Sequence, residues 1–242
     1  MQYAVIFGDI HGNLPALEAV FIDMSARGYD ANRYCLGDLV GYGTFPNEVI
    51  DLIRGHKIPS IMGNYDQGVG NNSDDCGCAY KTDHAKKLGE QSIAWSNAHV
   101  TDDNKAYLRN LPPHHTITIG KSDILLVHGS PRKVNEYLYE DRSDASLMRI
   151  MDGIDASVMI CGHTHLPYDR TLPDGRRIIN AGSVGKPKDN NRDACYIVVK
   201  ASDNTISVEF IRVPYDVEHA ARAIEATTMP NEFAQMLRDG RG

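Results

Sequence analysis

The segment Tyr3-Ala4-Val5-Ile6-Phe7-Gly8-Asp9-Ile10-His11-Gly12-Asn13 passes from an apolar run into a short turn that carries Asp and His. The run Tyr3–Phe7 predicts a buried strand, and the residues from Leu14 to Gly28 predict a helix with apolar side chains at helical spacing. Asp9 and His11 therefore follow the carboxyl end of a strand, which is where open α/β sheets bind ligands. Residues i and i+2 of an extended chain face the same side, so we expect both side chains to point toward one ligand.

The same pattern recurs along the 242 residues, because short apolar runs alternate with longer amphipathic stretches. This alternation is typical of a layered α/β protein. We expect strands at Tyr3–Phe7, Arg33–Leu36, Ile58–Met62, Thr116–Ile119, Ile124–Val127, Ser157–Ile160, Arg177–Ile179, Tyr196–Val199 and Ile206–Val213. Further helices are expected to begin near Pro46, Ser92, Asp102, Asp144 and Asp216.

No repeat or low-complexity linker marks a boundary, so we expect a single domain over residues 1–242. Residues 67–83 are rich in Gly, Asn and Asp without periodicity and predict a long loop, typical of a binding loop or lid. The tail at 215–242 predicts helix, either docked on the domain or forming a homodimer contact.

The composition, with 42% hydrophobic and 24% charged residues, is that of a folded soluble protein and excludes disordered, collagen-like and coiled-coil chains. Lys and Arg number 25 against 32 Asp and Glu, and the resulting net charge of −7 argues against a partner that is duplex nucleic acid. No apolar run approaches the ~18 residues of a membrane span, and no signal peptide is recognisable. The five cysteines suit reduced thiols, so we expect a cytoplasmic protein without membrane contact.

Metal-capable side chains follow five of the expected strands. They occur in Gly8-Asp9-Ile10-His11, Gly37-Asp38, Gly63-Asn64, His128-Gly129-Ser130 and Gly162-His163-Thr164-His165. Two carboxylates, one amide oxygen and four imidazoles are enough donors for two divalent ions that share a bridging ligand. Mixed nitrogen and oxygen ligation favours Mn, with Fe, Zn, Co or Ni as alternatives, over Ca or Mg.

In this order the five motifs resemble the calcineurin-like metallophosphoesterase family, in particular its small bacterial and archaeal phosphodiesterase-like members. The resemblance implies a four-layer α/β/β/α sandwich of two mixed sheets flanked by helices. It also implies that one metal is held by Asp9, His11 and His165, that Asp38 bridges both metals, and that Asn64, His128 and His163 hold the second. The implied reaction is hydrolysis of a phosphate ester by metal-bound hydroxide.

One position departs from the family pattern. Many members follow the Gly-Asn pair with a His that pairs with the next acid and helps to protonate the leaving group, whereas this chain has Tyr65 and Asp66. A phenol donates a hydrogen bond but is a slow proton shuttle at neutral pH. We therefore predict Asp38, Asn64, His128 and Tyr65 as catalytic residues and leave the general acid open.

Several other side chains have two interpretations. Substrate contacts are predicted for Asn64 and Arg132, and Lys186 is a weaker candidate for the same role. Arg132 and Lys186 are considered because cationic side chains bind phosphate oxygens well. His84, beside the long loop, is either a substitute acid or a solvated surface residue. Cys76-Gly-Cys78 is either a metal or redox pair or a plain loop tip.

The function predicted from these motifs is hydrolysis of a small or nucleotide-type phosphodiester by a dinuclear centre. The alternatives are a phosphomonoesterase or protein phosphatase, and a catalytically weak metal-binding scaffold. The complete ligand set argues against the scaffold, and Tyr65 argues for it.

Overall fold

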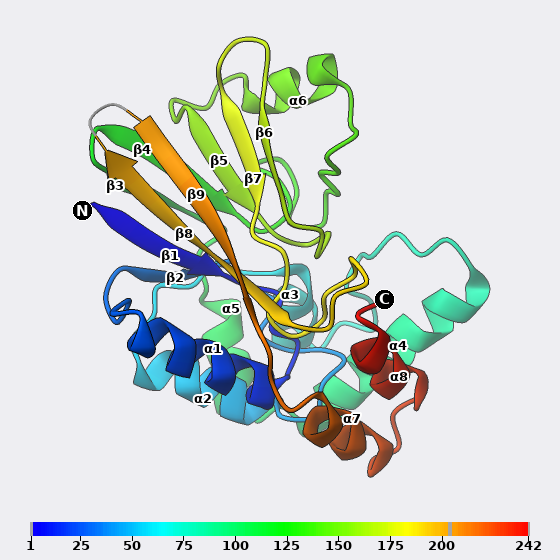
Figure 1. Ribbon diagram of the computed structural model, residues 1–242. Helices are drawn as coiled ribbons and strands as arrows, with labels where there is room; N and C mark the ends of the chain where they lie inside the picture. Colours follow the sequence, from blue (N-terminus) through cyan, green and yellow to red (C-terminus); the bar gives the residue numbers. More distant parts are fainter. Residues whose placement is uncertain (1, 203–204, 242) are drawn as a thin grey trace.

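Two β-sheets lie face to face in the computed structural model, which describes residues 2–202 and 205–241 (Figure 1). The first sheet has the strand order β2-β1-β8-β9, and the second has the order β3-β4-β5-β7-β6. The first consists of β1 (Tyr3–Phe7), β2 (Arg33–Cys35), β8 (Ala194–Ser202) and β9 (Thr205–Val213). The second consists of β3 (His114–Ile119), β4 (Ser122–Val127), β5 (Val158–Cys161), β6 (Tyr168–Thr171) and β7 (Arg177–Asn180).

Both sheets are mixed. Strand β1 is parallel to β2 and antiparallel to β8. In the second sheet β4, β5 and β7 are parallel, and the antiparallel strands β3 and β6 form its two edges. The parallel strands bring the carboxyl ends of β1 and β2, and of β4 and β5, to the same end of the molecule, where the polar motifs begin.

Alternation along each strand divides the apolar side chains between an inner and an outer face. Ile6 and Ile160 belong to the core between the sheets. Phe7 packs outward in the core formed with α1 (Leu14–Ala26) and α2 (Pro46–Gly55). On the other side, Met159 packs outward with α6 (Asp144–Met151). The expected four-layer arrangement of two mixed sheets flanked by helices is confirmed.

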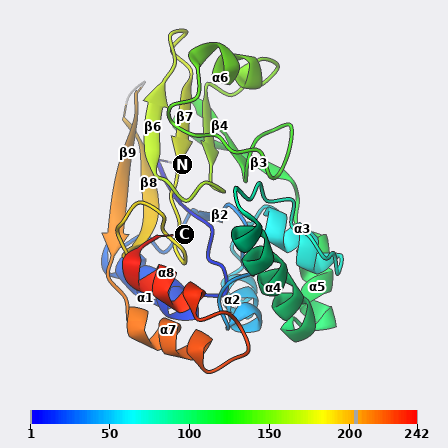
Figure 2. The ribbon, with the colours of Figure 1, turned by 90° about the vertical axis from the view of Figure 1, so that its right-hand side faces the viewer.

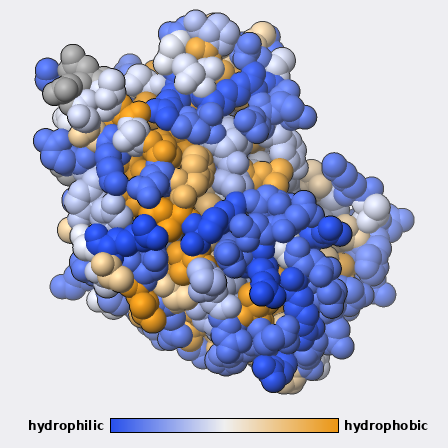
Figure 3. Space-filling view, in the orientation of Figure 1, coloured by the Kyte–Doolittle hydropathy of each residue, from blue (hydrophilic) through white to orange (hydrophobic). Residues whose placement is uncertain are grey.

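The remaining helices gather at the end of the molecule that carries the polar motifs (Figure 2). They are α3 (Asn64–Gly70), α4 (Asp83–His99), α5 (Asp102–Arg109), α7 (Val217–Glu225) and α8 (Glu232–Asp239). Leu88 of α4 shares an apolar cluster with Ile224 of α7 and Phe233 of α8. The helical tail is therefore docked on its own chain, and Figure 3 shows a mostly hydrophilic surface over these helices and an apolar band along β9.

Several elements differ from those expected. Helix α4 begins at Asp83, where the Thr82 side chain accepts a hydrogen bond from the Ala85 amide, rather than near Ser92. Helix α3 extends to Gly70, so the expected irregular loop at 67–83 is confined to residues 71–82. The expected strand Ile58–Met62 is reduced to one bridge, between Cys35 and Ser60.

Residues 1 and 242, the two ends of the expected domain, lie outside the described residues, as do residues 203 and 204. Within the described part of the chain, every helix is too short or too polar to cross a bilayer.

Candidate metal centre

The metal-capable side chains are brought together by turns at the ends of strands from both sheets. Asp9 and His11 follow β1, and Asp38 follows β2. The second sheet contributes His128 after β4, and the His163-Thr164-His165 motif after β5. The turns are joined directly, because the Asp9 amide donates to the Gly37 carbonyl at 2.9 Å and the His163 amide donates to Asp9 Oδ2 at 3.0 Å.

Five of these residues have backbones in the left-handed region. Their φ angles are 50° at Asp9, 51° at His11, 52° at Asp38, 65° at His163 and 62° at His165. The two side chains of Asp9 and His11 do converge, as expected. The expected reason, an extended backbone between them, is wrong, because both residues have left-handed backbone. Left-handed backbone is unfavourable for residues with a Cβ by about 1 kcal/mol each, and such strain concentrates at functional sites.

Two groups of three side chains result. The first group contains Asp9, His11 and His165, and the second contains Asp38, His128 and His163. All six residues are buried, and within each group the ligand atoms lie within 4.8 Å of one another. Each group offers one carboxylate oxygen and two imidazole nitrogens, which is a divalent-metal donor set.

Asp38 lies between the two groups. Its Oδ2 is 3.4 Å from His128 Nε2 and 3.6 Å from His11 Nε2. Asn64 joins the second group, because its Oδ1 is 3.1 Å from His128 Nε2. The Asn64 amide nitrogen donates to the Cys76 carbonyl at 3.0 Å, which turns the amide oxygen toward the centre.

Hydrogen bonds to backbone carbonyls orient three of the histidine rings. The Nδ1 of His11 donates to Val40 O at 3.0 Å, and that of His128 donates to Leu36 O at 2.8 Å. His165 Nδ1 donates to the carbonyl of Lys186 at 2.5 Å. Each ring therefore carries its proton on Nδ1 and presents Nε2 to the centre, which is the orientation of metal-binding imidazoles.

Burial keeps three of the histidines neutral. It lowers the pKa of His11 to about 3 and the pKa of His163 to about 2, and it lowers the pKa of His165 well below its usual value. Burial acts in the same direction on His128, but the carboxylates of Asp38 and Asp9 and the hydrogen bond to Leu36 together outweigh it and raise the pKa of His128 to about 10. A divalent cation would therefore displace a proton held by His128 and Asp38.

The environment of His163 tests whether these residues fit a metal. Its Nε2 is buried and has no hydrogen-bond partner among the described residues. An unpaired buried polar atom is destabilising by about 1–3 kcal/mol, so such atoms are rare. A bond to a cation would give this neutral nitrogen the partner that it lacks. Together with the two groups of ligand atoms, this shows that the residues fit a pair of divalent ions.

A family model for the calcineurin-like phosphoesterase superfamily domain matches residues 1–204. The chain belongs to this superfamily. It is a metal-dependent phosphoesterase, and the family predicted from the five motifs is confirmed.

Proteins of similar length resemble this chain in sequence, and two of them resemble it in structure. The chain is 31% identical over 253 residues to the uncharacterized protein MJ0912 of Methanocaldococcus jannaschii, and the match covers 98% of this chain and 97% of that protein. The crystal structure of the hypothetical protein PH1004 from Pyrococcus horikoshii OT3 is 26% identical, covers 99% of both chains and has a TM-score of 0.84. The crystal structure of a metallophosphoesterase from Sphaerobacter thermophilus is 27% identical with the same coverage and a TM-score of 0.75.

A cavity of about 450 Å³ opens beside the metal ligands. His11, Asp38, Asn64, His163 and His165 lie in its wall. The segment 78–81 of the long loop and the side chains of Phe233 and Met236 on α8 line the same cavity. The loop thus borders the metal centre, together with a helix that lies beyond the end of the family model.

Tyr65 also lines this cavity and is buried. Its amide donates to Asp38 Oδ1 at 2.8 Å, and its hydroxyl is 3.3 Å from that of Tyr80. Burial raises the pKa of the Tyr65 phenol well above its usual value, so the phenol stays neutral at physiological pH.

Asp66 stabilises the turns that carry the ligands. It is fully buried, and its carboxylate accepts hydrogen bonds from the amides of Asp38 at 2.8 Å, Leu39 at 2.8 Å and Gly63 at 3.0 Å. Burial and the neighbouring Asp38 raise the pKa of Asp66 to about 7. The Asp66 carboxylate thus holds the backbone amides of the ligand turns.

The structure does not bring Arg132 to the cavity beside the ligands. Its guanidinium pairs with Glu136, and it lines a different cavity, of about 700 Å³, on the side of His128 that faces Pro131 and Val134. Lys186 and Lys188 line the cavity at the metal ligands instead. The sequence analysis did not single out Lys188. It could have been found, because it lies in the segment that follows β7, just as the other candidate site residues follow the ends of strands.

The remaining candidates lie at the edge of the centre or away from it. The His84 side chain is 70% exposed and 4.0 Å from Glu232, which agrees with a solvated surface residue. The Sγ atoms of Cys76 and Cys78 are 3.2 Å apart, and Cys78 Sγ accepts a hydrogen bond from the Asn64 amide at 3.3 Å.

Proposed function

We propose that this protein is a dinuclear phosphodiesterase that acts on a small, nucleotide-type substrate. The observation that carries the proposal is the pair of buried ligand groups with Asp38 between them, and with a cavity of about 450 Å³ opening onto them. The loop segment 78–81 and helix α8 border this cavity, so a small ester fits it better than a protein surface does.

Each metal-binding residue has a role in this proposal. Asp9, His11 and His165 would hold the first ion, and Asn64, His128 and His163 would hold the second. Asp38 would be a ligand of both, because its Oδ2 approaches His11 Nε2 at 3.6 Å and His128 Nε2 at 3.4 Å. When bound, two such ions acidify a water molecule and neutralise charge on the phosphate during in-line displacement.

The chain's own residues set the geometry of the reaction. The backbone carbonyls that hold Nδ1 of His11, His128 and His165 fix the rings, so little reorganisation is needed when substrate binds. Asn64 is proposed to contact the phosphate through its amide as well as the metal. Tyr65 supplies a neutral phenol that donates hydrogen bonds, because burial keeps its pKa high.

The absence of an imidazole acid at position 65 supports a diester substrate with a good leaving group, which departs without strong proton donation. We further propose Mn²⁺ as the native metal, since the four imidazoles and the oxygen donors suit it. A cytoplasmic location is proposed from the five cysteines, all of which are free.

The test is hydrolysis of bis(p-nitrophenyl) phosphate and of p-nitrophenyl phosphate by the purified protein with Mn²⁺. We expect the diester to be the better substrate and Asp38→Asn to lose at least about 100-fold in rate, as for other groups that stabilise transition-state charge. Asp51→Asn, an exposed carboxylate on α2, is the matched control. Equal rates for the wild type and Asp38→Asn would refute the mechanism, and a clear monoester preference would identify a phosphomonoesterase.

A further inference from the structure

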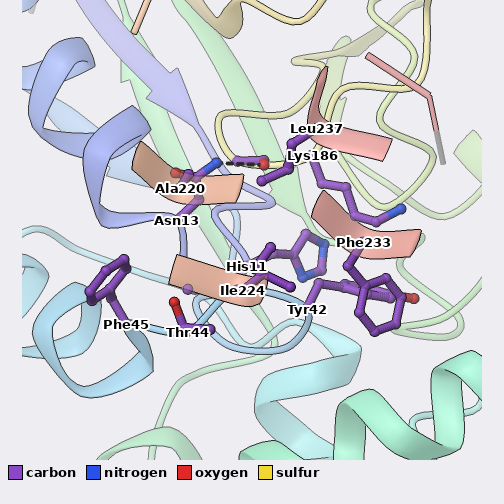
Figure 4. Close-up of a pocket in the computed structure, with 13 residues that line it drawn as sticks. His11, Asn13, Tyr42, Thr44, Phe45, Lys186, Ala220, Ile224, Phe233 and Leu237 are labelled. Atoms are coloured by element: carbon purple, nitrogen blue, oxygen red, sulfur yellow. Dashed lines mark hydrogen bonds between the residues drawn. The ribbon is translucent and has the colours of Figure 1, made fainter. Parts of the chain in front are cut away.

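Two lysine side chains line the cavity beside the metal ligands. Lys186 and Lys188 belong to the segment that follows β7, and both face the cavity of about 450 Å³. Lys186 is only 4% exposed, and its Nζ lies 4.6 Å from the centre of the Tyr42 ring. Figure 4 shows the Lys186 side chain extending past His11 and Tyr42 toward Phe233.

Neither ammonium group has an acidic partner within ion-pair distance, although the carboxylates of Asp9 and Asp38 lie close enough to attract Lys188. Within residues 2–202 and 205–241, the Nζ atoms of Lys186 and Lys188 form no ion pair and no hydrogen bond. A buried lysine is rare unless it is paired, because removing its charge from water is unfavourable. The buried Lys186, with the partly buried Lys188 in the same cavity wall, therefore points to an anion that is not part of the chain.

The charge of the cavity wall agrees with this. Lys81 is the third lysine in the wall, and Asp38 is the one carboxylate among the residues that line it. Asp38 is itself a candidate metal ligand. The other charged side chains of the wall are the three lysines, so this part of the wall is positively charged. A chain with a net charge of −7 thus has a locally cationic pocket, which attracts anionic substrates.

Lys186 lies next to the candidate metal ligands and is not one of them. The Tyr42 ring is 5.0 Å from the ring of His11 and 4.6 Å from Lys186 Nζ. The Lys186 carbonyl accepts the hydrogen bond of His165 Nδ1, so the lysine segment is joined to the ligand turn. A phosphate at the two ligand groups would leave Lys186 free to contact an adjoining anionic group, with Lys188 in the same cavity wall.

We propose that Lys186 and Lys188 form a subsite for a second phosphate of the substrate, adjacent to the phosphate that is attacked. This inference rests on the proposed function and narrows it to esters or anhydrides that carry at least two linked phosphates, such as nucleoside diphosphates and their derivatives. The two ammonium groups donate charge-assisted hydrogen bonds to that phosphate, which are about twice as strong as neutral ones.

The test is calorimetric titration of the Mn²⁺-loaded protein with AMP and with ADP, at one fixed concentration of free Mn²⁺. The two probes differ by one phosphate, so the ratio of their dissociation constants reports on the subsite. In the wild type we expect ADP to bind at least about tenfold more tightly than AMP. In Lys186→Met and Lys188→Gln the ratio falls to within about threefold, whereas Lys188→Arg retains it because the charge is kept.

Lys121→Gln, at an exposed lysine in the turn between β3 and β4, is the matched control and keeps the wild-type ratio. Equal affinities for AMP and ADP in the wild type would overturn the proposal without any variant. An undiminished ratio in a folded Lys186→Met, Lys188→Gln double variant would also overturn it.

The outcome is separable from that of the hydrolase assay. Hydrolysis of the diester without an ADP preference would reject the subsite and leave the phosphodiesterase proposal standing. An ADP preference that depends on the two lysines, in a protein that hydrolyses no ester, would reject the hydrolase proposal and retain the subsite.

Discussion

Replacement of Asp66 separates the contribution of the ligand scaffold from that of the ligands themselves. The Asp66 carboxylate accepts three backbone hydrogen bonds: Oδ2 from the amides of Asp38 and Gly63, and Oδ1 from the amide of Leu39. Asp66→Ala leaves all three buried amides unpaired, at about 1–3 kcal/mol each. The sum of about 3–9 kcal/mol is a large part of the ~5–15 kcal/mol that stabilises a typical domain.

Asp66→Asn has a much smaller effect because one side-chain oxygen remains. That oxygen can occupy the place of Oδ2 and accept from Asp38 and Gly63, so that only the Leu39 amide loses its partner, at about 1–3 kcal/mol. Both variants remove the same buried charge beside Asp38, so this contribution cancels when they are compared. We expect Asp66→Ala to be less stable than Asp66→Asn by at least about 2 kcal/mol.

The assay is urea unfolding followed by circular dichroism at pH 7, with a chelator present so that metal binding does not contribute. The exposed control Asp51→Asn should lie within about 0.5 kcal/mol of the wild type. Identical urea midpoints for Asp66→Ala and Asp66→Asn, with unchanged slopes, would refute the reasoning.

A second measurement on Asp66→Asn concerns the metals. Asp66 touches no ligand side chain in the hydrogen bonds above, yet it positions the amides of Asp38 and Gly63. Loss of such outer contacts typically weakens metal affinity by about 10–100-fold, and we expect a change of this size in calorimetric Mn²⁺ titrations. Unchanged affinity would show that the turns keep their geometry without Asp66.

Three further predictions concern other parts of the molecule. His163→Ala removes one member of the second ligand group, so elemental analysis should find about one metal per chain in place of two, and two ions in the variant would contradict the assignment. Burial alone would raise the pKa of Glu136, but the hydrogen bonds from Arg132, Ser130 and Arg142 and the charge of Arg132 together outweigh it, and the pKa falls to about 2. A carboxyl group with a lowered pKa stabilises the fold above its unfolded value of about 4.5 and loses this contribution as the pH falls toward about 2. Glu136→Gln should therefore lower stability by about 1 kcal/mol at pH 7, with a deficit that shrinks between about pH 5 and about pH 3 in urea unfolding; a constant deficit would argue against the ion pair. Phe233 is 2% exposed and packs 5.1 Å from the Tyr42 ring, so Phe233→Ala should destabilise by about 3–5 kcal/mol, and a loss below about 1 kcal/mol would show that α8 is not part of the core.

The strands that were predicted correctly and those that were not differ in how local their signal is. Strands β1, β4 and β5 are short apolar runs whose burial on both faces is visible in composition alone. Strand β6, Tyr-Asp-Arg-Thr, was missed because an edge strand needs no apolar run. The apolar segment 58–62 forms only the bridge at Ser60, because the other backbone amides of the segment donate to Ile53 of α2 and to Pro112 and not to a neighbouring strand.

The start of α4 was placed too late for a similar reason. Its first turns, from Asp83 to Lys87, are polar and exposed except for the intermediate Ala85, so they lack the apolar periodicity that predicts a helix. The helix begins there because Thr82 caps it, and a single capping residue is a weak signal in a polar segment.

The sequence by itself determined the family and the candidate ligand set, because Asp, His and Asn beside glycine at successive strand ends carry the chemistry in their identities and order. Only the tertiary structure decided how these groups meet. The left-handed backbones at Asp9 and Asp38 are held by hydrogen bonds between turns far apart in the chain. The tertiary structure also decided which cationic side chains reach the cavity beside the candidate ligands. Lys186, in the segment after β7, lines this cavity, whereas Arg132 pairs with Glu136 away from it. The direction of a side chain after a turn depends on long-range packing, which residue identity and spacing do not encode.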